Sequence, residues 1–409
     1  MQKIVLEEPY QHVPPRHATA WPTMFQHVLP WYLRKTYGIM TCEIVGMDRL
    51  RASLAAGHGI MLMPNHSRDE DGLVMGQLSC KLQTWFYYMS SWHLFKASWP
   101  MSFLLPRVGV YSVYREGPDR AAVKTSVGLL TQGSRPVVIF PEGYLGRTND
   151  RLNPLMDGAA LIARSAAKIR ARHNPPSQVV VHPVAIRYRL KGPLEPGVAG
   201  VLTNLEKRLG LPLGSQLSLF SRLEAIEVAM LDKLENEELG RLQTGPITTR
   251  RSQLIQAILA PLEDEWNGHR SEQESVQSRV RGLRTSIVQG LVSGGLTPEE
   301  HRRRWRQLQS IYTAQGLDNY PPDYLAGQPT PERVLETIER LEEDLTDKVH
   351  PHVPLAVTVS IGEAIVVNPV GAGRGGSDPL LSAVEGQLRT MLGLTSANAD
   401  KPSGVVAPR

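Results

Sequence analysis

One histidine stands among acidic residues in the stretch LMPNHSRDEDG, residues 62–72. An imidazole can take the proton of a hydroxyl group, and a carboxylate bonded to its other ring nitrogen fixes the tautomer that this reaction needs. His66 and Asp71 lie five residues apart, so inside one helix their side chains would point about 140° apart. Across the start of a helix they can meet, because the preceding chain bends back over the first turn. The pattern therefore indicates a histidine–aspartate base dyad.

Two other interpretations of this stretch involve no base. Ser67 and Glu70 have the S-x-x-E spacing of a capping box, which predicts a helix that begins just after Ser67. The acids at 69–71 would then be favourable charges at a helix N-terminus, with His66 a bystander. A metal site would need two or three well-placed ligands, and no H-x-H or H-E-x-x-H spacing supplies them, so no metal is expected.

The chain as a whole has the composition of a globular protein. Its 409 residues suffice for two or three domains, and 41% hydrophobic with 21% charged residues argues against wholesale disorder. A net charge of +5 suits an anionic ligand or membrane surface and does not by itself indicate nucleic acid. Two cysteines cannot build a disulfide framework, so a cytoplasmic, reducing location is expected. With no signal-peptide pattern and no run of 18 apolar residues, no membrane span is predicted.

Short apolar runs alternate with helical stretches in the first part of the chain. Buried strands are expected at 59–64, 135–141 and 178–186, and helices at 71–81 and 158–172. This alternation predicts an α/β fold, with a mixed, largely parallel sheet flanked by helices. From residue 195 to 350 the apolar residues follow helical spacing throughout, and no internal repeat is evident.

Strand chemistry returns in LAVTVSIGEAIVV, residues 355–367. An isolated strand pair after a helical block cannot bury itself, so this segment most simply rejoins the first sheet. We therefore predict one discontinuous α/β domain of residues 1–190 and 352–396, with a large helical insertion at 195–350. Residues 397–409 are expected to be a disordered tail.

Four motifs resemble, in chain order, those of the glycerolipid acyltransferases, the 1-acylglycerol-3-phosphate acyltransferase family. They are NHSRDED at 65–71, GVYSVYR at 109–115, FPEG at 140–143 and VHPVAI at 181–186. In addition, VGMDRL at 45–50 is similar to the family's lead-in strand, and IGEAI at 361–365 to its closing strand. The resemblance covers about half of the chain.

This resemblance implies acyl transfer from acyl-CoA or acyl-carrier protein to a hydroxyl group of a lysophospholipid or glycerol phosphate. The donor is a co-substrate, and no cofactor is implied. His66 and Asp71 would form the catalytic dyad. The implied substrate-binding residues are Asn65, Arg115, Glu142, Gly143 and Arg147. Arginine suits a phosphate-bearing acceptor because its planar fork matches phosphate oxygens.

Two motifs depart from the family pattern and keep other functions open. Ser112 stands where the family usually has phenylalanine, and Tyr144 follows Gly143 where threonine or serine and then arginine are usual. The acceptor could therefore be a lipid alcohol or amine without phosphate, or the chain could be a non-catalytic lipid-binding or scaffold protein. HSRDEDG is also similar to the H-H-x-x-x-D-G motif of condensation-type CoA acyltransferases, but the second histidine and their D-F-G-W-G motif are absent.

Lipid substrates imply a protein associated peripherally with the cytoplasmic side of a membrane. Two stretches rich in aromatic residues suit the headgroup region, and they contain Trp21, Trp31, Trp92 and Trp99. For the first of them, residues 21–37, a helix packed on the core is an equal alternative, and Pro30 weakens any long helix there.

Overall fold

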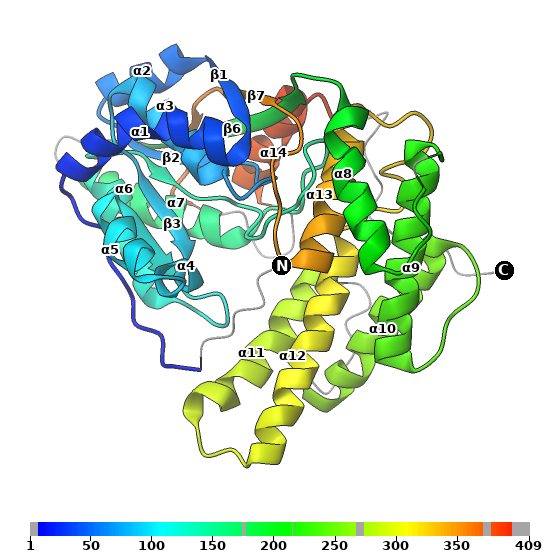
Figure 1. The fold of residues 1–409 in the computed structure, drawn as a ribbon. Coiled ribbons are helices and arrows are strands. Elements are labelled where there is room, and N and C mark those ends of the chain that lie inside the picture. Colours follow the sequence, from blue (N-terminus) through cyan, green and yellow to red (C-terminus); the bar gives the residue numbers. More distant parts are fainter. Residues whose placement is uncertain (1–6, 174–176, 215, 267–273, 371–377, 395–409) are drawn as a thin grey trace. The chain divides into compact units, whose positions relative to one another are not determined.

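The computed structural model describes residues 7–173, 177–214, 216–266, 274–370 and 378–394 (Figure 1). These residues separate into two compact units. The first consists of Tyr10–Lys191 and the segment that begins at Pro354. The second contains Gly192–Val353, and the predicted helical insertion falls inside it.

One sheet runs through the first unit. Its strands are β1 Ile39–Val45, β2 Gly59–Pro64, β3 Tyr87–Ser91, β4 Val110–Val113, β5 Val137–Val138, β6 Val179–Leu190, β7 Leu355–Ile361 and β8 Ile365–Val366. Over the described residues the eight strands lie in the order β1-β7-β6-β2-β5-β3-β4, and β8 pairs with β6. β6, β2, β5, β3 and β4 are mutually parallel, whereas β7 is antiparallel to β6 and parallel to β1. The prediction of a mixed, largely parallel sheet is confirmed.

Helices cover both faces of this sheet. They are α1 Ala20–Tyr37, α2 Met47–Ala55, α3 Asp71–Leu82, α4 Trp92–Lys96, α5 Trp99–Arg107, α6 Arg120–Gln132, α7 Asp157–Arg170 and α14 Pro379–Leu392. Residues of α6, α7 and α14 enter one buried cluster with Met61 and Met63 of β2. Because side chains alternate along a strand, the buried Ile60 and Leu62 point to the opposite face. There α1 packs on α3, and α2 contacts β7.

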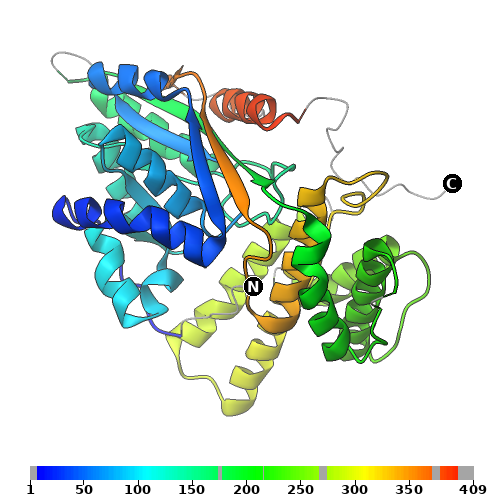
Figure 2. The ribbon, with the colours of Figure 1, turned by 45° about the horizontal axis from the view of Figure 1, so that its top comes forward.

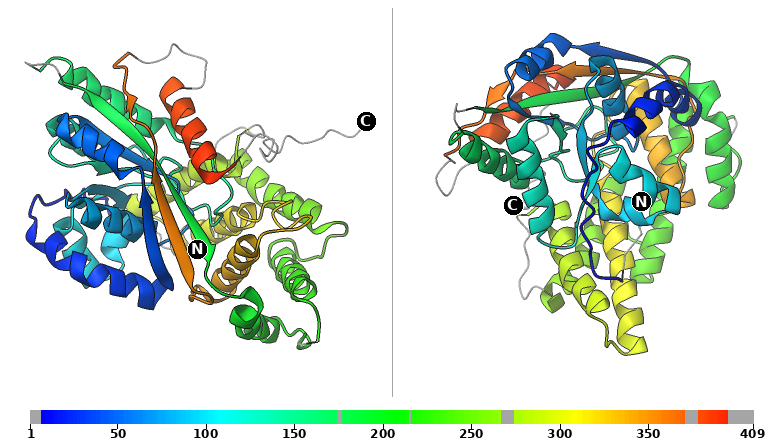
Figure 3. Two further views of the ribbon diagram at one scale, coloured as in Figure 1. Left: turned by 90° about the horizontal axis from the view of Figure 1, so that it is seen from above. Right: turned by 90° about the vertical axis from the view of Figure 1, so that its left-hand side faces the viewer.

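The strand β7 returns to the sheet after the helical unit, and Figure 3 (left) shows it between β1 and β6. Its register pairs Leu355 with Leu190 of β6, and the backbone N–H of Lys191 donates to the carbonyl oxygen of Pro354 at 2.7 Å. The prediction that residues 355–367 rejoin the first sheet is confirmed. The two ends of the helical segment therefore leave from neighbouring strand ends.

The prediction of a lead-in strand at 45–50 is wrong. β1 ends at Val45, and the helix α2 begins at Met47. Between them Gly46 adopts a φ of +76°, and a Cβ at this position would lie 2.6 Å from the carbonyl oxygen of Ile361. Both the left-handed backbone and the close approach of β7 require glycine here, and the turn they produce starts the helix.

The second unit is all-helical over its described residues. Its helices are α8 Leu194–Arg208, α9 Leu219–Leu239, α10 Ile247–Trp266, α11 Val276–Ser293, α12 Pro298–Asp318 and α13 Pro331–Thr346. Apolar residues of α9 to α12 share one buried cluster. It contains the two faces expected from helical spacing, for example Leu254 and Leu259 of α10 with Leu308 and Ile311 of α12.

One buried ion pair recurs along this unit. The fourth residue of α9, α10 and α11 is an arginine each time: Arg222, Arg250 and Arg279. Each Nε donates to a buried glutamate 15 or 16 residues earlier, on the preceding helix, at 2.7–2.9 Å: Glu206, Glu235 and Glu263. The same contact therefore joins each of these helices to the preceding one.

The stretch 21–37 forms the single helix α1, which continues through Pro30. One side is buried through Leu29 and Leu33, while Met24 and Trp31 are exposed. The helix therefore both packs on the core and presents apolar side chains to solvent. Pro30 does not interrupt it.

Trp92 lies in the interior, with 1% of its surface exposed, beside the rings of Tyr10 and Tyr114. Its expected contact with a membrane is therefore wrong. Among the described residues, no helix combines the length and the apolar character needed to cross a membrane. The predicted disordered tail, 397–409, lies outside the described residues.

Candidate active site

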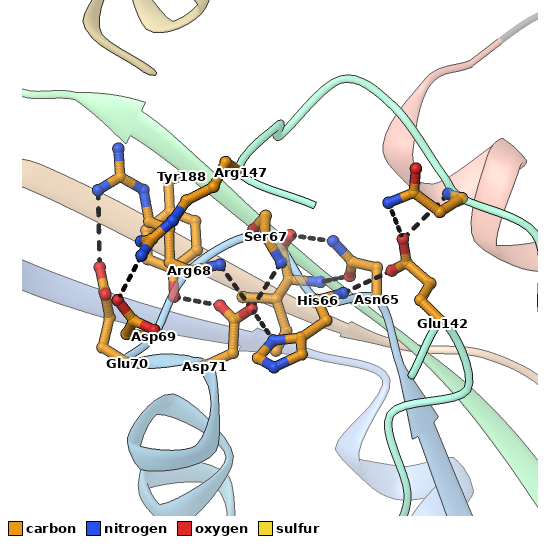
Figure 4. A network of polar contacts seen from close by, with 12 residues as sticks. Asn65, His66, Ser67, Arg68, Asp69, Glu70, Asp71, Glu142, Arg147 and Tyr188 are labelled. Atoms are coloured by element: carbon orange, nitrogen blue, oxygen red, sulfur yellow. Dashed lines mark hydrogen bonds and ion pairs between the residues drawn. The ribbon is translucent and has the colours of Figure 1, made fainter. Parts of the chain in front are cut away.

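Three of the expected motifs lie at or just beyond the carboxyl ends of parallel strands and therefore meet at one edge of the sheet. β2, β4 and β5 end at Pro64, Val113 and Val138. The carboxyl ends of parallel strands lie together and are where ligands bind in open α/β sheets. Figure 4 shows the polar network that the first and third motifs build there.

His66 and Asp71 are in contact at this edge. His66 Nδ1 lies 3.0 Å from Asp71 Oδ2. Asp71 is the first residue of α3 and is fully buried, whereas the side chain of His66 is 23% exposed. A carboxylate accepts hydrogen bonds only, so Nδ1 carries the hydrogen and Nε2 is left as the basic nitrogen. Nε2 has no hydrogen bond to any described residue. This geometry can accept a proton from a bound hydroxyl group.

The carboxylate of Asp71 accepts three further hydrogen bonds (Figure 4). Oδ2 accepts the backbone N–H of Ser67 at 2.7 Å and of Arg68 at 2.9 Å, and Oδ1 accepts the hydroxyl of Tyr188 at 2.6 Å. The capping box predicted from Ser67 is therefore wrong. The helix begins at Asp71, and Glu70 makes no side-chain cap. Asp71 itself binds the N–H groups of the preceding turn.

Tyr188 was not among the expected site residues. It lies on β6 with 1% of its surface exposed, and burial, followed by the charge of Asp71, raises the pKa of its hydroxyl well above the ordinary value. The hydroxyl therefore stays protonated and donates a hydrogen bond to Asp71. Asn149 fixes the backbone of Tyr188 by accepting from its N–H and donating to its carbonyl oxygen, both at 2.9 Å. The sequence around it, RYR at 187–189, lies beyond the apolar run 178–186 and gave no signal for this contact.

The loop that follows β5 holds the backbone of His66 on both sides. Glu142 Oε1 accepts the N–H of His66 at 2.7 Å, and the N–H of Gly146 donates to the carbonyl oxygen of His66 at 2.8 Å. The imidazole also packs on Phe140, with ring centroids 4.2 Å apart. The third motif therefore positions the residue that carries the base.

Glu142 makes these contacts from the interior, where 2% of its surface is exposed. Its Oε2 accepts the backbone N–H of Asn153 at 3.0 Å and the side-chain amide of Asn153 at 2.7 Å. Burial raises the pKa of Glu142 to about 7, against the opposing effect of these donors. A substrate contact was expected for Glu142. Both of its oxygens are bonded inside the protein, where the side chain joins two loops, and the substrate contact stays a prediction.

Asn65 makes contacts that support the fold, and the substrate contact expected for it stays a prediction. The side chain is buried, its Oδ1 accepts the N–H of Ile186 at 2.7 Å, and its Nδ2 donates to the carbonyl oxygen of Ile186 at 3.1 Å. The amide continues the ladder between β2 and β6 beyond the end of β2. It thereby fixes the direction in which the chain enters His66.

Arg115 and Gly143 bring the second and third motifs together. Arg115 Nη2 donates to the carbonyl oxygen of Gly143 at 2.7 Å. Gly143 has a φ of +74°, and a Cβ there would lie 2.0 Å from the sulfur of Met156. The close neighbour that requires glycine is thus a side chain of the protein. Arg115 remains half-buried two residues beyond β4, at the same edge as His66.

Arg147 reaches the first motif. Its Nη2 lies 2.8 Å from Oδ2 of Asp69, which stands between the two residues of the dyad in the sequence. The side chain of Arg147 is 15% exposed and that of Asp69 is 62% exposed. Arg115 and Arg147 therefore both lie on segments that contact the base or its loop. Asp69 was not among the expected site residues.

The departure at Ser112 has a structural reason. The Ser112 hydroxyl accepts the N–H of Val13 at 2.8 Å, and the N–H of Ser112 donates to the carbonyl oxygen of Val13 at 3.0 Å. Tyr10 of the same N-terminal segment stacks on Tyr114, at 5.0 Å between ring centroids. Serine here binds a segment that covers β4, and the change does not touch the dyad.

Residues 42–187 match the family model described as Acyltransferase. This range contains all four motifs. No curated protein matches the chain. Residues 42–187 are thus similar to an acyltransferase domain, which supports acyltransferase activity in general. The matched range ends within β6, so neither β7 nor the helical unit is part of it.

Proposed function

We propose that the protein is an O-acyltransferase, similar to the 1-acylglycerol-3-phosphate acyltransferases, with His66 as its general base. The observation that carries this proposal is the hydrogen bond from His66 Nδ1 to the buried Asp71, which leaves Nε2 without a hydrogen bond to any described residue. Such a base typically accelerates a reaction by about 10²–10⁴-fold.

In the proposed reaction, Nε2 of His66 takes the proton of the acceptor hydroxyl as its oxygen attacks the thioester carbonyl of acyl-CoA or acyl-carrier protein. The new carbon–oxygen bond forms and the carbon–sulfur bond breaks. The departing thiolate then takes the proton from the imidazolium, so the base is restored. Asp71 stabilises the imidazolium while it exists and keeps Nδ1 protonated throughout.

The proposed acceptor is a lysophospholipid or glycerol phosphate. Arg115 and Arg147 are two guanidinium groups on segments next to the base, and a guanidinium binds phosphate through two parallel hydrogen bonds. A second candidate is a lipid alcohol or amine without phosphate. It is favoured by the fact that Arg147 already pairs with a carboxylate in the free protein.

We also propose that the protein works at the cytoplasmic surface of a membrane. Trp31 of α1 is 58% exposed and Trp99 of α5 is 76% exposed. The two helices are in contact through the rings of Trp21 and Phe103, 5.5 Å apart, and Figure 2 shows α1 in dark blue beside α5 in cyan. Exposed tryptophans on neighbouring helices suit the headgroup region of a bilayer.

Release of free thiol from acyl-CoA or acyl-carrier protein tests these proposals, measured against a panel of lysophospholipids, glycerol phosphate and uncharged monoacylglycerol. We expect thiol release that depends on a phosphate-bearing acceptor. Turnover only with the uncharged acceptor would favour the second candidate. Lipid binding without any turnover would support a non-catalytic lipid-binding or scaffold protein.

A further inference from the structure

The ion pair between Arg147 and Asp69 lies at a fixed place beside the base. Arg147 follows Gly146, whose N–H is bonded to the carbonyl oxygen of His66. The backbone of Arg147 has a φ of +54°, a left-handed conformation that a non-glycine residue keeps only when its surroundings hold it. On its other side come Thr148 and Asn149, both buried. Arg147 is therefore anchored to the same loop that positions His66.

Asp69 is anchored as well. It lies in the turn before α3, between the mostly buried Arg68 and Glu70, and two residues before Asp71. The turn is held by the bond from the backbone N–H of Arg68 to Asp71. Asp69 itself points outward, and its carboxylate is the exposed partner of the pair. An anionic ligand that approached Arg147 would therefore meet the charge of Asp69 at once.

A second pair of the same kind lies next to the first. Arg68 Nη1 is 3.7 Å from Glu70 Oε1. Arg68 and Arg147 thus each have a carboxylate beside them, which offsets their positive charge. A phosphomonoester headgroup carries a charge of about −1.5 to −2 near neutral pH. A phosphodiester headgroup carries one negative charge, and it is repelled less by Asp69.

We propose that Asp69 determines acceptor specificity, by disfavouring a phosphomonoester headgroup relative to a phosphodiester one. This inference rests on the proposed function, because it takes Arg147 as part of the acceptor site. Among the proposed acceptors it favours lysophospholipids whose phosphate is a diester. The aspartate acts by competing with the ligand phosphate for the guanidinium of Arg147.

The test compares lysophosphatidate, a phosphomonoester, with lysophosphatidylglycerol, a phosphodiester. For Asp69→Asn we expect the KM for lysophosphatidate to fall about threefold relative to that for lysophosphatidylglycerol, the modest size expected of a pair with one exposed partner. In an Arg147→Ala background the same substitution should change the ratio of the two KM values less, because the guanidinium that holds the ligand phosphate beside Asp69 is gone. Asp48→Asn, an exposed acid in the first turn of α2, is the matched control.

Binding measurements separate this inference from the proposed function. Titration calorimetry with short-chain forms of the two lipids, on His66→Ala and on His66→Ala/Asp69→Asn, reports the acceptor site without turnover. We expect the second variant to bind lysophosphatidate about threefold more tightly relative to lysophosphatidylglycerol. An unchanged ratio, or binding of neither lipid, overturns the inference. If these variants bind the two lipids in the expected ratio but the wild type turns over neither, only the proposed catalysis is contradicted.

Discussion

Tyr188 donates a 2.6 Å hydrogen bond to Asp71 from a strand that lies 117 residues later in the chain. It takes the carboxylate oxygen that His66 does not use, so one oxygen faces the base and the other faces the core (Figure 4). The guanidinium of Arg68 lies over the tyrosine ring, 5.2 Å from its centroid. The base is therefore oriented by a chain of three side chains, and each link can be tested separately.

The dyad itself gives the first prediction. His66→Ala removes the proton acceptor and should lower kcat/KM by about 10²–10⁴-fold. Asp71→Asn should be similarly impaired, because an amide can donate to Nδ1 and thereby favours the wrong tautomer. Thiol release measures the rate, and thermal unfolding is the control for His66→Ala, for which we expect a nearly unchanged melting temperature. Wild-type turnover in either variant would contradict the role of the dyad.

Tyr188→Phe tests the link between the strand and the dyad. Loss of the hydroxyl leaves one oxygen of a buried carboxylate without its donor, which costs about 1–3 kcal/mol of stability. We expect kcat to fall by about tenfold with KM unchanged, measured well below the unfolding temperature. Tyr111→Phe is the matched control, because its buried hydroxyl bonds Ser126 at 2.8 Å, away from the dyad. An equal loss of kcat in both variants would mean that only stability had changed.

The residues that the sequence predicted and those that it did not differ in how local their contacts are. His66 and Asp71 could be paired because a helix start was recognisable between two nearby residues. Tyr188 could not be paired with Asp71, since their contact depends on the pairing of β6 with β2. The position of the helix start was wrong for a related reason. A serine three residues before a glutamate satisfies the capping pattern, but the carboxylate of Asp71 took the available N–H groups.

The same distinction applies to the fold. The return of residues 355–367 to the sheet followed from their apolar pattern, which needs burial. The burial of Trp92 did not follow, since an aromatic stretch has the same composition inside a protein and at its surface. The recurring arginine–glutamate contacts could not be predicted from the sequence. An arginine and a glutamate 15 or 16 positions apart give no periodic signal in a segment that contains many other charged residues.

Glu142 predicts a pH dependence of stability. Burial raises its pKa in the folded protein to about 7 from an ordinary value of 4.5. Between these two pH values the folded state holds the proton that the unfolded state releases, so this group destabilises the fold as pH rises from 4.5 to 7. In Glu142→Gln the contribution is absent. The free energy of unfolding of the wild type, relative to the variant, should fall by about 3 kcal/mol over this range.

Denaturant titrations at several pH values measure this difference. Above pH 7 the carboxylate accepts from both His66 and Asn153, which an amide cannot do with both of its atoms. Glu142→Gln should therefore also lose turnover above pH 7. A constant difference in unfolding free energy from pH 4.5 to 7 would contradict the raised pKa.

Exposed tryptophans give the prediction for membranes. Trp31→Ala and Trp99→Ala should each lower co-sedimentation with anionic vesicles severalfold, and the double variant should bind least. Each substitution removes an aromatic ring that would insert into the headgroup region. Binding should also fall with salt, given the net charge of +5. Leu242→Ala is the control, because Leu242 is as exposed as Trp31, at 58%, but lies in the other unit. Equal binding by the wild type and the three tryptophan variants would contradict a role of α1 and α5 in membrane contact.

The helical unit is inserted between two strands that already meet. Leu190 pairs with Leu355, and the backbone N–H of Lys191 donates to the carbonyl oxygen of Pro354 at 2.7 Å, as in the last pair before a hairpin turn. Two residues of the Asn-Gly type suffice to close such a pair. We therefore predict that residues 192–353 can be replaced by Asn-Gly. The product should remain folded, with β6 and β7 as an ordinary hairpin.

Circular dichroism and cooperative thermal unfolding measure this outcome, and thiol release shows whether the dyad stays functional. The contrasting variant ends at Val353 and so lacks β7 and α14. It should not fold cooperatively, because β1 then loses its pairing partner and β6 loses both β7 and β8. It also exposes the cluster on which Leu381 and Val384 of α14 pack. If the excised protein were unfolded while the truncated one folded, residues 354–394 would not complete the sheet, and the helical unit would have to be part of the same folding unit.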